Sequence, residues 1–225
     1  MVNNIMKKIQ NWFCLLIFFL FFGTSVIAQK EVVFNLADLH RDGKLRIQNR
    51  GVTTENANNK SYIKISGGVY SGVVWLPIQD FKNGKIEIIA RGKDIAQNSF
   101  YGIAFHAQND STFDDVYCRP FNFKAADSVR KIHAIQYVAY PKYDWPLLRK
   151  EFNGIYEKGI ENPPNAEDWV TLSLLINDEE VRAFINHALK PALVVKKLNT
   201  NKSGYIGLTG FNCDVEQIRV FPEEK

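Results

Sequence analysis

Cysteine and histidine are scarce in this sequence, and neither sign of charge dominates it. Its 225 residues include 3 Cys and 4 His, and 28 basic residues stand against 24 acidic ones. A chain of this length can bury a core without disulfide support, and no His or Cys spacing typical of a metal site occurs. The small net charge gives no argument for a nucleic-acid partner.

Long apolar runs are missing as well, except near the N-terminus. Residues 13–22 are almost wholly apolar, follow a pair of lysines and precede a small-residue pattern ending at Ala28. This layout is typical of a secretory signal, whereas a membrane anchor needs about 20 apolar residues. We therefore expect residues 1–28 to be a signal peptide. Residues 29–225 would then form one secreted or periplasmic domain with no membrane association after cleavage.

Sustained helical periodicity is the third absence, because no stretch after residue 28 repeats apolar residues every 3.6 positions. Short alternating or apolar segments recur instead, separated by Gly, Pro, Asn and Asp. They predict strands at 31–36, 62–66, 69–76, 85–91, 100–107, 113–121, 132–140, 169–176, 180–185, 193–195, 203–211 and 215–221. This pattern favours an all-β fold, a two-sheet antiparallel jelly-roll sandwich.

Residues 141–168 break the strand pattern with four prolines and several aromatic side chains. Long irregular segments inside compact domains are usually functional. Pro146 suits the first turn of a helix, which predicts a short helical turn over 145–151.

Polar and aromatic residues gather in the strands around residues 100–140. Val116 and Cys118 suit the core, so alternation places Asp115 and Arg119 on the opposite face. The same parity in the neighbouring strands turns further polar side chains outward. If these strands are adjacent, one surface collects His106, Asp115, Arg119, Gln136 and Tyr140.

Such a mixture is suited to carbohydrate. Sugar hydroxyls need fixed donors and acceptors, which Arg, Asp and Gln supply, and their CH faces lie against aromatic rings. The long loop adds candidate substrate-binding residues: Tyr143, Trp145, Arg149 and Glu157. Each residue also has a plainer interpretation. A lone strand histidine such as His106 is more often hydrogen-bonded structure than catalyst, and Tyr143 and Trp145 could simply pin the loop to the sheet.

The sequence leaves the cofactor and the cysteine pairing open. Asp110, Asp114 and Asp115 could hold a divalent cation such as Ca²⁺, but no spacing rule supports that set and no metal ligand is assigned. Cys118 and Cys213 could pair in an oxidising compartment, although sequence cannot place them within bonding distance. The oligomeric state is also open.

With these residues in view, the chain resembles the 3-keto-disaccharide hydrolase domain family. The resemblance rests on YGIAFHAQNDSTFDDVYCRPFNF, AIQYVAYPKYDWPLLR, EDW, PALVVKKL and SGYIGLTG, and is most specific over residues 100–149. It implies a concanavalin A-like jelly roll, related to laminin-G domains and family-16 glucanases, with a carbohydrate-facing concave sheet. It also implies a secreted bacterial protein that acts on glycosides oxidised at the 3-position.

That activity needs a base for the C2 proton, a cation or metal at the keto oxygen and an acid for the leaving group. Side-chain chemistry offers His106 or Asp115 as base, Arg119 as oxyanion partner, and Tyr140 or Glu157 as proton donor. The Glu-x-Asp-x-x-Glu pattern of family-16 glucanases is absent, which argues against paired-carboxylate catalysis. A non-catalytic carbohydrate-binding or adhesion module is the alternative. A protein-binding module would leave the polar groove unexplained.

Overall fold

The computed structural model describes residues 31–67 and 71–223 of the chain. The predicted signal peptide, residues 1–28, lies outside this range. Within the described part, no helix has the length and apolar character needed to cross a membrane.

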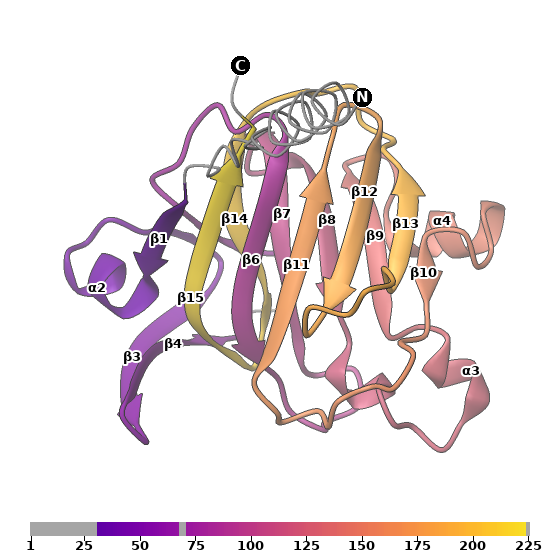
Figure 1. Cartoon of the computed structure of the whole chain (residues 1–225), viewed down its shortest axis with the longest axis horizontal. Coiled ribbons are helices and arrows are strands. Elements are labelled where there is room, and N and C mark those ends of the chain that lie inside the picture. Colours follow the sequence, from indigo (N-terminus) through magenta and orange to yellow (C-terminus); the bar gives the residue numbers. More distant parts are fainter. Residues whose placement is uncertain (1–30, 68–70, 224–225) are drawn as a thin grey trace, which may run out of the picture.

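Two antiparallel sheets stack face to face (Figure 1). The sheet nearer the viewer in Figure 1, here the front sheet, has the order β13-β12-β11-β6-β15-β4-β3, and β1 pairs with β15. Its strands are β1 (Val32–Asn35), β3 (Gly51–Ala57), β4 (Lys60–Ser66), β6 (Gly84–Arg91), β11 (Val170–Ile176), β12 (Glu180–Ile185), β13 (Leu193–Lys196) and β15 (Cys213–Pro222).

The second sheet, here the back sheet, has the order β10-β9-β8-β7-β14-β5-β2. Its strands are β2 (Arg46–Gln48), β5 (Val73–Trp75), β7 (Phe100–Asn109), β8 (Thr112–Cys118), β9 (Ile135–Tyr140), β10 (Glu157–Lys158) and β14 (Tyr205–Phe211). The strands β7, β8 and β9 are therefore adjacent, as the sequence interpretation required.

The core lies between the sheets and is built from the inward side of each pleat. Ile86 and Ile88 of β6 face Ile103 and Phe105 of β7 across it, and all four are fully buried. Each fully buried aliphatic side chain of this size contributes about 1.5–3 kcal/mol. The alternating apolar residues that predicted strands thus also hold the two sheets together.

The described part of the chain has four short helical segments, which lie at the edges of the sandwich (Figure 1). They are α2 (Leu36–Arg41), the 3-10 turn η1 (Pro120–Asn122), α3 (Ser128–Lys131) and α4 (Trp145–Glu151). The predicted helical turn over 145–151 is confirmed as α4, whose first backbone N–H is capped by Asp144. The helix α2 was expected to be strand and loop; the Asn35 side chain caps it by accepting from Asp38 N at 3.2 Å.

Cys118 and Cys213 are free and fully buried. Cys118 lies in the back sheet and Cys213 in the front sheet, and each side chain belongs to the shared apolar core. Burial raises the pKa of both thiols. They act as small apolar side chains here.

Candidate functional site

A groove of about 620 Å³ opens on the outer face of the back sheet. Its floor consists of side chains from β7, β8, β9 and β14, and α4 contributes to one side. The lining residues are Arg50, Ser71, Gly72, Ala96, Gln97, Phe100, Phe113, Asp115, Tyr117, Arg119, Phe121, Asn122, Arg130, His133, Tyr140, Trp145, Arg149, Thr209, Gly210 and Phe211. The cluster predicted from pleat parity therefore coincides in large part with a real groove.

The pleat of β8 produces this surface. Asp115, Tyr117 and Arg119 point into the groove, whereas Val116 and Cys118 point into the core. Successive strand residues face opposite sides, so the three groove residues form a row with about 6.6 Å between neighbours. The predicted placement of Asp115 and Arg119 on one face is confirmed.

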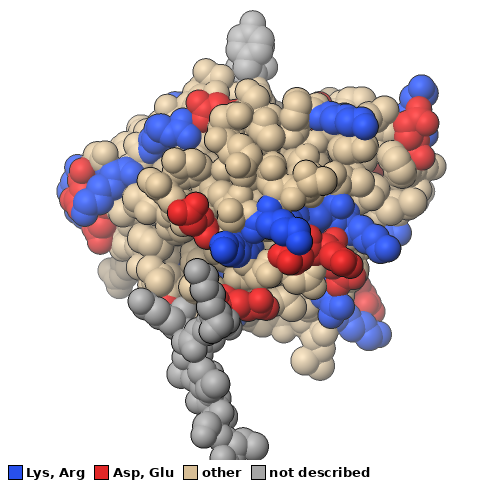
Figure 2. Space-filling model, turned by 90° about the horizontal axis from the view of Figure 1, so that it is seen from above, with Lys and Arg blue, Asp and Glu red and all other residues tan. Residues whose placement is uncertain are grey.

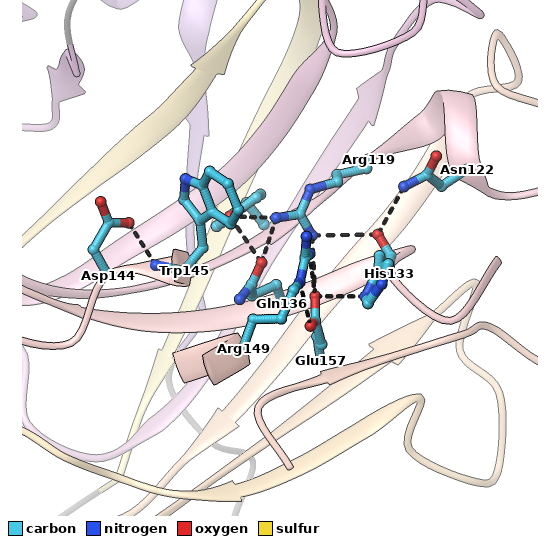
Figure 3. Close-up of polar contacts among 9 residues, drawn as sticks. Arg119, Asn122, His133, Gln136, Asp144, Trp145, Arg149 and Glu157 are labelled. Carbon is cyan, nitrogen blue, oxygen red and sulfur yellow. Dashed lines mark hydrogen bonds and ion pairs between the residues drawn. The ribbon is translucent and has the colours of Figure 1, made fainter. Parts of the chain in front are cut away.

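Arg119 is almost completely buried, and neighbouring side chains hold its guanidinium in place (Figure 3). It donates to the Tyr117 hydroxyl at 2.8 Å, to the Gln136 side-chain oxygen, and to the His133 carbonyl at 3.2 Å. The Tyr117 hydroxyl also donates to Gln136 at 3.1 Å. Gln136 faces outward as predicted but lies beneath the groove, where it orients Arg119.

Glu157 of β10 lies under the neighbouring part of the groove and binds a second arginine (Figure 3). Arg149 of α4 donates to both carboxylate oxygens, at 2.8 and 2.7 Å, in the bidentate geometry that favours Arg over Lys. Arg119 Nη1 is 3.9 Å away from the same carboxylate. Burial raises the pKa of Glu157, but the bonds and charge of Arg149, with His133 and Arg119, outweigh it and lower the pKa overall. Glu157 is therefore an ionised anchor for Arg149, and this removes it as a proton donor.

Asp115 is the acidic side chain at the groove surface. It is 4% exposed and accepts from the Thr209 hydroxyl at 2.8 Å. Burial raises its pKa to about 7. The hydrogen bond from Thr209 acts to lower this pKa, and the charge of Asp114 acts to raise it. Tyr140 shares the groove, and burial with the charges of Asp115 and Asp144 raises the pKa of its hydroxyl. The groove thus holds a carboxyl that titrates near neutral pH and a phenol that stays protonated.

Aromatic rings line the rest of the groove. Phe100 packs against Tyr117, Phe121 and Phe211, with ring centroids 6.0, 5.4 and 5.2 Å apart. Trp145 stands at the side of α4 with 43% of its surface exposed, and the Arg149 guanidinium lies 5.1 Å from its ring centre. Trp145 thus lines the groove, and its predicted role in substrate binding stays a prediction.

The expectation that His106 shares this surface is wrong. Between its pairings with Gly207 and Tyr205, β7 has one residue more than β14, and His106 has a φ of 49° at this β-bulge. The extra residue reverses the parity, so His106 turns to the inner side and is fully buried. There it contacts the Lys82 carbonyl, and its Nδ1 lies 2.8 Å from Lys197 Nζ. Burial lowers its pKa to about 4, which keeps the ring neutral.

Tyr143 also lies outside the groove lining. Its backbone pairs with Ala139 through hydrogen bonds of 2.8 and 2.9 Å, and its ring packs against the edge of the core. The plainer interpretation of Tyr143, that it pins the loop to the sheet, fits these contacts.

Three basic groove residues were missed from the sequence: Arg50, Arg130 and His133. Arg50 precedes β3 and Arg130 lies in α3, so both come from segments read as loops. His133 could have been noticed because it stands beside the strand that carries Gln136. Its Nδ1 lies 2.8 Å from the Glu157 carboxylate without hydrogen-bond alignment. Burial lowers the pKa of His133 and the charges of Arg149 and Arg119 act in the same direction, so the pKa is lowered overall although Glu157 raises it.

The three aspartates considered for a divalent cation do not converge. Asp115 faces the groove, Asp114 accepts from the Tyr137 hydroxyl on the inner side, and Asp110 pairs with Arg46 at 2.6 Å. Across residues 31–67 and 71–223, no group of three or more His, Cys, Asp or Glu side chains is arranged to hold a metal ion. These residues therefore do not fit a shared cation site.

No protein-family model matches the sequence, and a comparison with curated proteins finds no match. Solved structures with the same fold exist at low identity. A Bacillus subtilis protein of unknown function with a galectin-like fold is 14% identical, with a TM-score of 0.54 over 85% of this chain and 94% of that one. The VIP36 exoplasmic/lumenal domain in its Ca²⁺/Man-bound form is 10% identical, with a TM-score of 0.55 over 81% and 84%.

A family-16 endo-glucanase from Bacteroides ovatus is 13% identical, with a TM-score of 0.50 over 75% of this chain and 84% of that one. At such identities the likeness concerns the fold. It confirms the predicted two-sheet antiparallel jelly-roll sandwich. The resemblance to the 3-keto-disaccharide hydrolase family stays a prediction.

Proposed function

We propose that the groove of the back sheet binds carbohydrate and that Asp115 acts there as a general base. Arginine and amide groups next to exposed and half-buried aromatic rings suit the hydroxyls and CH faces of sugars. The solved structures with this fold include the Ca²⁺/Man-bound VIP36 domain and a family-16 endo-glucanase, which favours the same ligand class. Fold alone does not assign function, so the proposal depends on the groove chemistry.

The observation that carries the catalytic part is Asp115 itself. A buried carboxyl with a pKa of about 7 at the surface of a groove is matched to proton transfer near neutral pH. The ordinary carboxyls on the protein surface are too acidic for this task. Asp115 replaces His106 as the base, because His106 is sealed on the other side of the sheet.

The reaction that fits this base is cleavage of a glycoside oxidised at C3. Asp115 takes the C2 proton, and the C2–H electron pair forms an enolate whose charge rests on the keto oxygen. The enolate then returns its electrons and expels the C1 oxygen, which takes a proton from Tyr140. Water adds across the resulting C1–C2 double bond and yields the free 3-keto sugar.

Arg119 is the group placed to stabilise the enolate. Tyr117 separates Asp115 from Arg119 in the row along β8, and the guanidinium folds back to 4.9 Å from the Tyr117 ring centre. In this proposal the keto oxygen of the bound sugar faces the guanidinium while its C2 carbon lies against Asp115. Because the charge of Arg119 is fixed before substrate arrives, it needs little reorganisation.

The test is turnover of a 3-keto-glucoside by the wild-type protein and by Asp115→Asn. We expect the substitution to lower kcat by at least about a hundredfold, the usual worth of a general base, with a smaller effect on KM. Asp110→Asn is the matched control, since Asp110 lies in the same hairpin outside the groove lining. Equal loss in both variants, or none in either, would refute the role of Asp115.

A non-catalytic carbohydrate-binding role is the second candidate, and the aromatic lining of Phe100, Phe121, Phe211 and Trp145 favours it. Binding of a glycan by the wild-type protein without turnover of any 3-keto form would establish this candidate instead. In either case we propose export to the periplasm or the medium, with residues 1–28 as the signal. The exported protein should then begin at Gln29, which N-terminal sequencing can check.

A further inference from the structure

Charge in the groove is strongly unequal. Four arginines line it, Arg50, Arg119, Arg130 and Arg149, whereas Asp115 is the acidic residue of the lining. The chain as a whole has nearly balanced charge, and basic and acidic side chains lie next to one another on the end of the molecule seen in Figure 2. The excess of positive charge is therefore a local property of the groove.

Glu157 compensates only part of this charge. Both of its oxygens accept from Arg149, and Arg119 approaches the same carboxylate at 3.9 Å. Two guanidinium groups thus share one carboxylate. Asp115 adds only about half a negative charge near pH 7, because burial raises its pKa to about 7.

Arg130 is held by neutral oxygens. Its Nε donates to the Asn122 side chain at 3.1 Å and its Nη2 to the Phe121 carbonyl at 2.7 Å. Within the described residues it takes part in no ion pair, and the guanidinium lies 5.9 Å from the Phe121 ring centre. These bonds orient the guanidinium while leaving its charge uncancelled and its Nη1 group available.

Arg50 adds a further positive charge from another part of the groove rim. It donates to the Gly210 carbonyl at 2.6 Å and the Asn49 carbonyl at 2.7 Å, and it lies 5.6 Å from the Phe211 ring centre. Cations from separate segments therefore share one partly dry groove, where repulsion between them is screened less than in water. An anionic ligand relieves that repulsion and accepts the bidentate donors that guanidinium groups offer.

We infer that the natural ligand of the groove is an acidic carbohydrate, carrying a carboxylate or a sulfate group that is bound by Arg130 together with Arg149. This inference rests on the proposed carbohydrate function and specifies its ligand class. One enolate oxygen would require one cation, so the reaction alone does not account for four arginines.

The experiment compares matched pairs of oligosaccharides by isothermal titration calorimetry with the wild-type protein. A galacturonic acid trisaccharide is paired with its methyl ester, and a κ-carrageenan tetrasaccharide with its desulfated form. We expect one acidic member to bind at least about tenfold more tightly than its neutral partner. The preference should shrink as NaCl rises from 50 to about 500 mM, because ions screen the attraction. The pair that responds identifies the anion as carboxylate or sulfate.

The matched variants are Arg130→Gln and Arg182→Gln. Arg182 is an exposed arginine of β12 in the front sheet, so its loss changes net charge equally without touching the groove. Arg130→Gln should weaken the acidic ligand about tenfold, as expected for a lost charge-assisted hydrogen bond, and leave the neutral partner unchanged. Arg182→Gln should change neither.

The outcomes separate this inference from the proposal beneath it. Equal affinity for the acidic and neutral members of both pairs overturns the inference and leaves carbohydrate binding intact. An acidic preference that Arg130→Gln and Arg182→Gln weaken equally also overturns it, because the effect would be one of net charge. Absence of binding to every carbohydrate in both charge forms overturns the inference and counts against the proposed function.

Discussion

At the scale of single residues, Asp115 links function to stability. Its pKa is about 7 in the folded protein and about 3.8 in the unfolded chain, so the protonated form favours folding. The stability that this group contributes is fully present below pH 4 and is lost as pH rises through 7. Each unit of pKa corresponds to about 1.4 kcal/mol, which makes the loss a few kcal/mol at most.

We therefore predict that Asp115→Asn stabilises the protein at pH 8.5 relative to wild type, and that the gain nearly disappears at pH 4. The amide oxygen can still accept from Thr209, so the hydrogen bond survives. Urea denaturation of both proteins at the two pH values measures the difference in their free energies of unfolding. Other titrating groups, such as His106, are the same in both proteins, so their contributions cancel in this difference. An equal stability difference at pH 4 and pH 8.5 would contradict it.

The residues of the site were predictable where side chains alternate regularly between the two faces of a strand, and unpredictable where this alternation is interrupted. Asp115 and Tyr140 lie in regular strand and Arg119 directly follows β8, so counting by two from apolar neighbours places all three on the groove face. His106 obeys the same count in the sequence, but the extra residue of the β-bulge turns it inward. The residues next to His106 in the sequence do not indicate the bulge, because the bulge depends on the register in which β14 pairs with β7.

At the scale of elements, α4 is the short helix that carries Trp145 and Arg149 to the groove. Asp144 caps it by accepting from Trp145 N at 2.6 Å. Loss of a capping side chain costs about 1 kcal/mol, and in a helix of seven residues the cap is, beside the burial of Leu148, a main contact that holds the first turn. We predict that Asp144→Ala weakens ligand binding through disorder of α4, by about threefold to tenfold.

The matched control is Asn35→Ala, which removes the equivalent cap of α2. Both variants should lose similar stability in thermal unfolding, and only Asp144→Ala should lose affinity for the ligand. If Asn35→Ala weakens binding as much, global destabilisation and not α4 is responsible. The sequence predicted α4 because Pro146 signals a first turn, whereas α2 was missed because its cap was read as part of a strand.

At the scale of the whole molecule, the sandwich was predictable and the groove charge was not. Turn residues between short apolar segments are local features, and they suffice to indicate two packed sheets. The arginines come from the turn before β3, from the residue after β8, from α3 and from α4, so Arg50 lies far along the chain from the other three. Their convergence depends on the tertiary arrangement of loops, for which a single sequence carries no periodic signal.

Because both sheets share one core, we predict that Cys118 and Cys213 become reactive together. Each thiol is buried in a different sheet, and burial raises the pKa of both, so neither forms a thiolate while the sheets stay packed. Alkylation with N-ethylmaleimide in increasing urea, read peptide by peptide by mass spectrometry, should label the two residues along one curve that coincides with loss of the far-ultraviolet circular dichroism signal. Labelling of one cysteine at clearly lower urea would mean that its sheet opens separately, and the sandwich would then not unfold as a single cooperative unit.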